Sequence, residues 1–277
     1  MTSSTPELEP GDALDLLSRG EIVVAGALVD ASNATLFSEA TLDGVTATCV
    51  YKPVAGERPL WDFPRSTLGR REVAAYLVSE LGGWGVVPPT VFREGPFGPG
   101  SVQLWIHPDP QDDVAAEPGA GLVEVVPVGA VPTGWLRVLD AYGGDGHPVS
   151  LVHADDDGLR SMAVFDVVSN NADRKGGHVL RGAGSALYGV DHGLVMHDEP
   201  KLRTVLWGWA GLSFSSCDVE RLERCASVLE GPSSSGLADL VSPTEVEALR
   251  VRVGRLLRRP VFPRARQDSP AIPWPPF

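Results

Sequence analysis

The stretch from Phe165 to Met196 reads FDVVSNNADRKGGHVLRGAGSALYGVDHGLVM. An apolar helical pattern leads into a polar loop punctuated by glycines, and this loop carries Asp173, Arg174 and His178. A short apolar run follows the loop and ends just before a second acidic residue, Asp191. The pattern of loop, short strand, turn and strand predicts a hairpin that brings the two aspartates opposite each other.

Two short motifs in this stretch carry a resemblance to known proteins. The segment Asn171–Arg174 has the form N-x-D-R, with His178 five residues after the aspartate, and Asp191–Gly193 has the form D-x-G. This pattern resembles the catalytic and metal-binding loops of the phosphatidylinositol 3- and 4-kinase superfamily. That superfamily includes HipA-like atypical kinases and a bacterial phosphatidylinositol-kinase-related family. The order of elements agrees from about Glu21 to Met196, and the specific motifs lie between Asn171 and Gly193.

The resemblance implies an α+β fold of the two-lobed atypical-kinase type. Its N-lobe is rich in strands and carries one main helix, and its C-lobe is mostly helical. The expected order is a disordered segment 1–10, an N-lobe 11–106, a linker or insertion 107–132, a C-lobe 133–263 and a proline-rich tail 264–277. The tail is not expected to form a folded element.

Local patterns of apolar, turn and capping residues predict the individual elements. Strands are expected over 21–29, which is apolar enough to be buried, and over 35–39, 45–52, 86–92 and 101–106, the first three forming a meander. Helices are expected over 13–18, 68–81, 133–142, 156–169, 218–229 and 243–257. Asp12 is expected to cap the first helix, in which Leu14 and Leu17 share a face. Ser242 and Glu245 have the spacing of a capping box before the last helix.

Composition limits the classes of partner and the cellular compartment. The chain has 277 residues and a formal net charge of −13, which disfavours nucleic acid or an anionic membrane as the main partner. Arginines between 250 and 266 form a basic stretch, interpreted as a solvated helix face followed by a tail. The 3 cysteines lack metal-ligand spacing and suit reduced thiols. With no signal peptide or long apolar run, a cytoplasmic protein without stable membrane association is expected.

Phosphoryl transfer from ATP requires a lysine on the phosphates, an acid that holds this lysine, metal ligands and a group that orients the acceptor. The resemblance assigns the first two roles to Lys52, at the end of the third strand, and to Glu72, on the helix that follows. Considered separately, each has an ordinary alternative: a lysine at a strand end, or a solvated helical glutamate.

Two further segments are assigned to the nucleotide. The turn containing Ser32 and Asn33 is expected to cover the phosphates through backbone N–H groups. It lacks glycine, so it matches no Walker or glycine-rich loop, and a simple hairpin turn is the alternative. Leu104, Trp105 and Ile106 are expected at the hinge near the adenine ring, although core packing explains these apolar residues equally well.

The central stretch supplies the remaining roles. Asp173 is expected to orient or deprotonate the acceptor hydroxyl, Arg174 to neutralise the local acids, and Asn171 to hold the backbone of the loop. His178 and Asp191 are expected to bind Mg²⁺ or Mn²⁺. Most relatives have asparagine at the histidine position; because a nitrogen ligand suits Mn²⁺ better than Mg²⁺, manganese is favoured. The alternative is that His178 is only a loop residue.

The function expected from these residues is that of an ATP-dependent kinase. Its acceptor is expected to be a hydroxyl of a soluble small molecule or of a protein, and autophosphorylation is included. Two alternatives stay open: a pseudokinase that binds nucleotide and metal as a sensor, and a transferase that moves AMP to a protein. A hydrolase-type metal centre built from His178, Asp191, His192 and His197 is disfavoured, because neither H-E-x-x-H nor H-x-H spacing occurs. No G-x-S-x-G motif of a serine hydrolase is present either.

Overall fold

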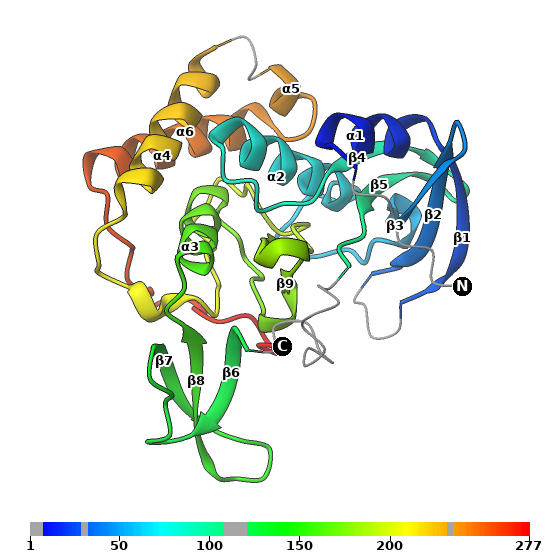
Figure 1. Cartoon of the computed structure of the whole chain (residues 1–277). Coiled ribbons are helices and arrows are strands. Elements are labelled where there is room, and N and C mark those ends of the chain that lie inside the picture. The colour runs from blue at the N-terminus through cyan, green and yellow to red at the C-terminus, as the bar shows by residue number, and fades with distance from the viewer. Residues whose placement is uncertain (1–7, 29–32, 108–120, 232–234) are drawn as a thin grey trace.

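A computed structural model of the chain describes residues 8–28, 33–107, 121–231 and 235–277. It is a mixed α+β structure in which the sheets are antiparallel. Figure 1 shows a five-stranded sheet on one side, a group of helices on the other, and a second sheet that projects away from the helices. None of the described helices is both long and apolar enough to cross a membrane.

The five-stranded sheet has the strand order β1-β2-β3-β5-β4, so the predicted meander of its first three strands is confirmed. The turn at Asp43 and Gly44 joins the second and third strands. The first strand is mostly exposed at the sheet edge, and the expectation that it is buried is wrong. The strands are β1 Glu21–Ala27, β2 Leu36–Leu42, β3 Val45–Pro53, β4 Thr90–Gly95 and β5 Gly98–Leu104.

The fourth strand starts later than the apolar run at 86–92 predicts. The backbone N–H groups of Val86 and Val87 donate to the Ser79 hydroxyl (3.0 and 3.3 Å). Two prolines follow, and proline has no N–H to donate to a ladder. Residues 86–89 therefore form a loop, and the hairpin of β4 and β5 turns tightly between Gly95 and Gly98.

Helix α1 (Pro10–Arg19) begins three residues before the predicted helix. Pro10 occupies its first turn, where a missing N–H costs nothing, and Asp12 lies inside the turn instead of capping it. The predicted disordered segment 1–10 therefore overlaps the start of α1 at Pro10. Residues 1–7 lie outside the described part. Leu17 is buried beneath the sheet, whereas Leu14 is only partly buried and packs against the main core.

Helix α2 (Leu68–Gly82) follows the short 3-10 helix η1 (Val54–Gly56) and agrees closely with the helix predicted over 68–81. Arg71 of α2 is fully buried: it donates to the Val195 carbonyl at 2.7 Å and forms an ion pair with Glu245 of α6. The capping box predicted for α6, formed by Ser242 and Glu245, is confirmed. The same glutamate therefore caps one helix and anchors the other.

The remaining helices enclose the main apolar core together with α2. Helix α3 begins one residue after its predicted start, and Asp156 caps it by accepting from the Leu159 N–H at 2.9 Å. The helices are α3 Asp157–Ser169, α4 Ser216–Glu230, α5 Ser235–Ala238 and α6 Pro243–Arg258, with 3-10 turns η2 Gly176–His178, η3 Ala183–Ser185 and η4 Trp207–Trp209. The short α5 has no counterpart in the sequence prediction.

A three-stranded sheet with the order β6-β8-β7 corrects two expectations. The helix predicted over 133–142 is strand β7, and the expected linker 107–132 contains strand β6. A glycine-rich turn at 143–146 folds β7 back onto β8, and this pairing overrides helical propensity. The strands are β6 Val123–Pro127, β7 Trp135–Tyr142 and β8 Pro148–Ala154. Residues 108–120 lie outside the described part.

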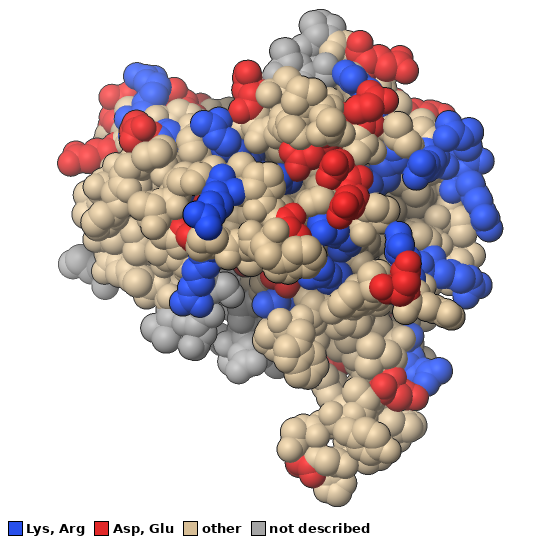
Figure 2. All heavy atoms as spheres, turned by 180° about the vertical axis from the view of Figure 1, so that it is seen from behind, with Lys and Arg blue, Asp and Glu red and all other residues tan. Residues whose placement is uncertain are grey.

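The basic stretch near the end of the chain is not simply a solvated helix face. Arg252 of α6 donates to the carbonyls of Val168 and His197 (2.9 and 3.0 Å), and burial lowers its pKa to about 10. The face shown in Figure 2 carries both basic and acidic side chains, and several of the basic ones are grouped near its right-hand edge.

Candidate active site

The loop after α3 is held by asparagine side chains. Asn170 ends the helix in a left-handed conformation (φ 55°), which asparagine tolerates better than most residues. The Asn171 side chain accepts from the Asp173 N–H (2.9 Å) and donates to Asp166 of α3 (2.9 Å). The prediction that Asn171 holds the backbone of this loop is confirmed.

Arg174 is fully buried, and its ion-pair partner is Asp166 rather than an acid of the loop (Nη2–Oδ1 2.9 Å). Its Nη1 also donates to the carbonyls of His178 and Val190, at 3.1 and 3.4 Å. At Gly189 a Cβ atom would lie 2.7 Å from this guanidinium, so only glycine allows the approach. Arg174 thus fastens α3, the loop and the hairpin together.

The predicted hairpin is confirmed as β9 (Val179–Arg181) paired with β10 (Leu187–Gly189). It brings Asp173, His178 and Asp191 together, with one donor atom from each lying within 4.8 Å of the others. These three residues are called the donor cluster below.

The protonation state of His178 suits a ligand role. Its Nδ1 donates to the Asp173 carbonyl at 2.8 Å, which leaves the lone pair of Nε2 free, 3.5 Å from Asp191 Oδ2. Burial lowers the pKa of His178 to about 4, so the ring is neutral at pH 7. Two carboxylates and one neutral imidazole are a suitable donor set for a divalent cation.

Lys52 joins the sheet to the donor cluster. Its Nζ donates to Glu72 Oε1 at 2.6 Å and to Asp191 Oδ1 at 2.7 Å. The Lys52 ammonium holds the pKa of Asp191 below its usual value, and the two acids raise the pKa of Lys52 despite its burial. The second oxygen of Glu72 accepts from the His192 N–H at 3.1 Å. The predicted pair of Lys52 and Glu72 is confirmed, and Asp191 completes it.

Asp173 is ionisable near neutral pH. Its side chain is 24% exposed, and burial raises its pKa to about 6, with a further contribution from Asp191. Lys175, at 3.8 Å, Arg174 and Arg203 oppose this shift by stabilising the carboxylate. A carboxylate with such a pKa can accept a proton from a substrate at pH 7.

The raised pKa of Asp173 predicts a gain in stability for Asp173→Asn. The folded pKa lies above the unfolded value, so ionised Asp173 destabilises the fold above about pH 6, and this cost disappears as the pH falls towards about 4. In the absence of metal at about pH 8, the free energy of unfolding of the variant is expected to exceed that of the parent by about 1–3 kcal/mol. Urea unfolding in a chelator, at several pH values, measures the difference.

The matched control for this measurement is Asp15→Asn, which removes an acid from an exposed ion pair with Arg19. It is expected to change the free energy of unfolding by less than about 0.5 kcal/mol. A gap between Asp173→Asn and the parent that stays constant with pH would contradict the assigned titration.

The structure describes only some of the residues that were predicted to bind a nucleotide. Asn33 lines a narrow pocket together with Lys52, Glu72 and Asp191, whereas Ser32 lies outside the described residues. Strand β5 ends at Leu104, two residues before the end of the predicted strand 101–106.

The two residues after β5, which were predicted to lie at a hinge, are packed against neighbouring side chains and backbone. Trp105 packs edge-on against Phe37 (5.1 Å between ring centroids), which is core-like packing. Ile106 lies against Gly182, which follows β9 in the β9–β10 hairpin.

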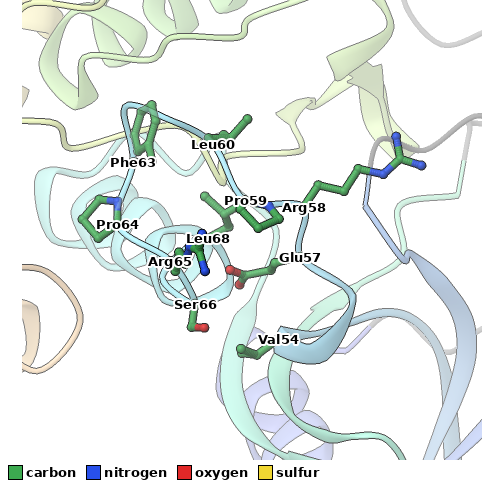
Figure 3. Close-up of a pocket in the computed structure, with 10 residues that line it drawn as sticks. All are labelled: Val54, Glu57, Arg58, Pro59, Leu60, Phe63, Pro64, Arg65, Ser66 and Leu68. Atoms are coloured by element: carbon green, nitrogen blue, oxygen red, sulfur yellow. The ribbon is translucent and has the colours of Figure 1, made fainter.

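Figure 3 shows a second pocket, formed by the loop between β3 and α2. It adjoins the Lys52 pocket, because Glu57 and Leu68 line both. The same loop is fastened to the segment after Asp191 by an ion pair of Asp62 and Lys201 at 3.2 Å.

The structure does not bring together the four residues of the alternative metal centre. His197 donates through Nε2 to the Asp62 carbonyl (2.9 Å) and packs against Phe63. His192 is buried and accepts from Arg174 through Nε2 at 2.6 Å, and burial lowers its pKa. In the described part of the chain His192 and His197 stand outside the donor cluster.

Sequence reasoning missed Asp166 as a site residue. It is fully buried and contacts Asn171, Arg174 and Thr204. An acid inside the apolar run MAVFDVV is a detectable indication, because a buried carboxylate requires a partner. Lys175 was also missed as a site residue, because only the three-dimensional structure shows that its ammonium lies 3.8 Å from the Asp173 carboxylate.

Comparisons with known proteins give one informative relative. No family model matches the chain. Protein Rv2133c of Mycobacterium tuberculosis is 50% identical to it over 264 residues, which is 95% of this chain and 94% of the relative. Identity at this level over almost the whole length shows common descent and a common fold. The chain therefore belongs to the same family as protein Rv2133c.

Proposed function

We propose that the protein is an ATP-dependent phosphotransferase with a two-lobed, atypical-kinase arrangement. One observation carries the proposal: Lys52 of the sheet contacts both Glu72 of α2 and Asp191 of the donor cluster. A lysine held by a helical acid, next to a metal-binding acid and a catalytic acid, is the set of parts that phosphoryl transfer requires.

The nucleotide phosphates are assigned to the pocket that contains Lys52. Because its two acids favour the charged form, Lys52 remains an ammonium at working pH and can contact phosphate oxygens. Glu72 keeps it in position from the helix side, and Asn33 lines the same pocket. The β5 segment that ends at Leu104 is assigned to the adenine side.

The donor cluster fits a divalent cation. Asp191 offers a carboxylate that stays ionised, and His178 offers an Nε2 whose lone pair faces that carboxylate. When bound, Mg²⁺ or Mn²⁺ would neutralise charge on the phosphate oxygens. The imidazole nitrogen favours Mn²⁺ over Mg²⁺, which prefers oxygen ligands.

In the proposed step, Asp173 accepts the proton of an acceptor hydroxyl. The hydroxyl oxygen forms a bond to the γ-phosphorus, the bond from that phosphorus to the β,γ-bridging oxygen breaks, and ADP leaves. Lys175 and Arg203 stabilise the ionised form of Asp173 before the transfer. The acceptor is a hydroxyl of a protein or of a soluble small molecule, and the protein's own hydroxyls are included.

The experiment that tests nucleotide binding is thermal unfolding with ATP and either Mg²⁺ or Mn²⁺, for the parent and for Asp191→Ala. A ligand at about a hundred times its dissociation constant stabilises the folded state by about 2.7 kcal/mol. We expect the midpoint of the parent to rise more when metal and ATP are both present than with either of them alone. The midpoint of Asp191→Ala is expected not to change with ATP and metal. This variant lacks the carboxylate that is proposed to bind the cation and that contacts Lys52.

The control is Asp15→Ala, in which a carboxylate far from the pocket is removed from an exposed ion pair. Its response to ATP and metal should equal that of the parent. If the parent does not respond to ATP with either metal, the assignment of a nucleotide site is wrong.

A further inference from the structure

Residues 271–277 form an extended segment, called the strap here, that crosses from the helical core to the loop carrying Asp173. The Ala271 carbonyl accepts from the Thr204 N–H and from Trp207 Nε1, at 3.0 and 2.9 Å. Pro273 is buried and Ile272 packs on the main core. Figure 1 shows this end of the chain beside β9. The expectation that this tail forms no helix or strand is correct, but it is packed in place.

The far end of the strap contacts the loop at Gly176. The Gly176 N–H donates to the Pro276 carbonyl at 2.8 Å, and the Phe277 ring covers the position that a Cβ of residue 176 would occupy. Gly176 is not in a left-handed conformation, so its backbone geometry does not itself require glycine. A side chain at residue 176 would instead displace the ring of Phe277.

Gly176 stands between two members of the donor cluster. His178 follows two residues later, its N–H donates to the Lys175 carbonyl at 3.2 Å, and its Nδ1 donates to the Asp173 carbonyl at 2.8 Å. Neither of these local hydrogen bonds uses the Gly176 N–H, which donates to the strap. The strap thus supplies an external contact to the short turn that sets the spacing of Asp173 and His178.

We propose that the strap is a positioning element for the metal donors, with Pro276 and Phe277 as its positioning residues. The inference rests on the proposed function, because it concerns the same donor cluster. Burial alone does not explain the contact, since Phe277 is 45% exposed and lies on the loop instead of in the core. The strap acts through the loop, and none of its residues belongs to the donor cluster.

The test is a Mn²⁺ titration of the full chain, in which the signal of free Mn²⁺ is followed by electron paramagnetic resonance. Phe277→Ala removes the ring, and Gly176→Ala displaces it with a methyl group. Each is expected to raise the dissociation constant for Mn²⁺ about fivefold, equivalent to about 1 kcal/mol. The double variant is expected to be no weaker than either single variant, because both changes remove the same contact.

Trp274→Ala is the matched control, because this strap residue is 89% exposed. It should leave the dissociation constant unchanged, and circular dichroism should show that all variants are folded. Parent-like Mn²⁺ affinity in both Phe277→Ala and Gly176→Ala would overturn the strap's role and leave the proposed function standing. Tighter binding would overturn it too, since the strap would then obstruct the site. A parent that binds no Mn²⁺ would overturn both.

Discussion

Replacing Asp173 with alanine is expected to lower the rate of phosphoryl transfer about 10²- to 10⁴-fold, the usual contribution of a positioned general base. The variant should still bind ATP with metal, because Lys52 of the nucleotide pocket and two members of the donor cluster, His178 and Asp191, are unchanged. The rate is measured with ATP labelled at the γ-phosphate, following both autophosphorylation and release of phosphate. ATP binding is measured separately, by the shift in the unfolding midpoint.

Each alternative function predicts a different result for the same pair of proteins. A protein that binds nucleotide without transferring phosphate would give equal, negligible turnover for the parent and Asp173→Ala. Label that reaches protein from the α-phosphate, and not from the γ-phosphate, would indicate transfer of AMP. Asp15→Ala controls for the loss of a carboxylate and should keep the parental rate, because its ion pair with Arg19 lies on the surface of α1.

The parts of the site that are local in sequence were the most predictable. The loop motif and the short apolar run after it determine the hairpin, so the approach of Asp173 and Asp191 follows from neighbouring residues. The contact of Lys52 with Glu72 was also expected, but only from the resemblance to a kinase family. The distance of 2.6 Å between Lys52 Nζ and Glu72 Oε1 depends on how α2 packs against the sheet. The periodicity of the sequence carries no information on that packing.

Features that depend on distant contacts were not predictable. The segment 133–142 has no strong strand pattern, and its structure as β7 follows from pairing with β8. The strap is rich in proline, a composition typical of disorder, yet its carbonyls accept hydrogen bonds from Thr204 and Gly176. By contrast, the start of α6 was predicted correctly, because a capping box needs only four consecutive residues.

The second large effect is expected at Asp166, where Asp166→Asn should lower the free energy of unfolding by about 3–5 kcal/mol. Asp166 and Arg174 are both fully buried, and removing one charge of a buried pair leaves the other without compensation. The amide also fits poorly, because Asp166 accepts bonds from Arg174, Asn171 and Thr204. Urea unfolding at about pH 7 measures the loss, and Asp15→Asn should change it by less than about 0.5 kcal/mol.

A double variant separates the effect of the charge from that of the geometry. In Asp166→Leu/Arg174→Met both charges are absent, and such replacements of a buried ion pair are often neutral for stability. We expect the double variant to recover most of the stability that Asp166→Asn loses. It should nevertheless bind Mn²⁺ more weakly than the parent, because the bonds from Arg174 to the carbonyls of His178 and Val190 are lost. Parental Mn²⁺ affinity in the double variant would show that Arg174 contributes charge balance alone and does not position the donor cluster.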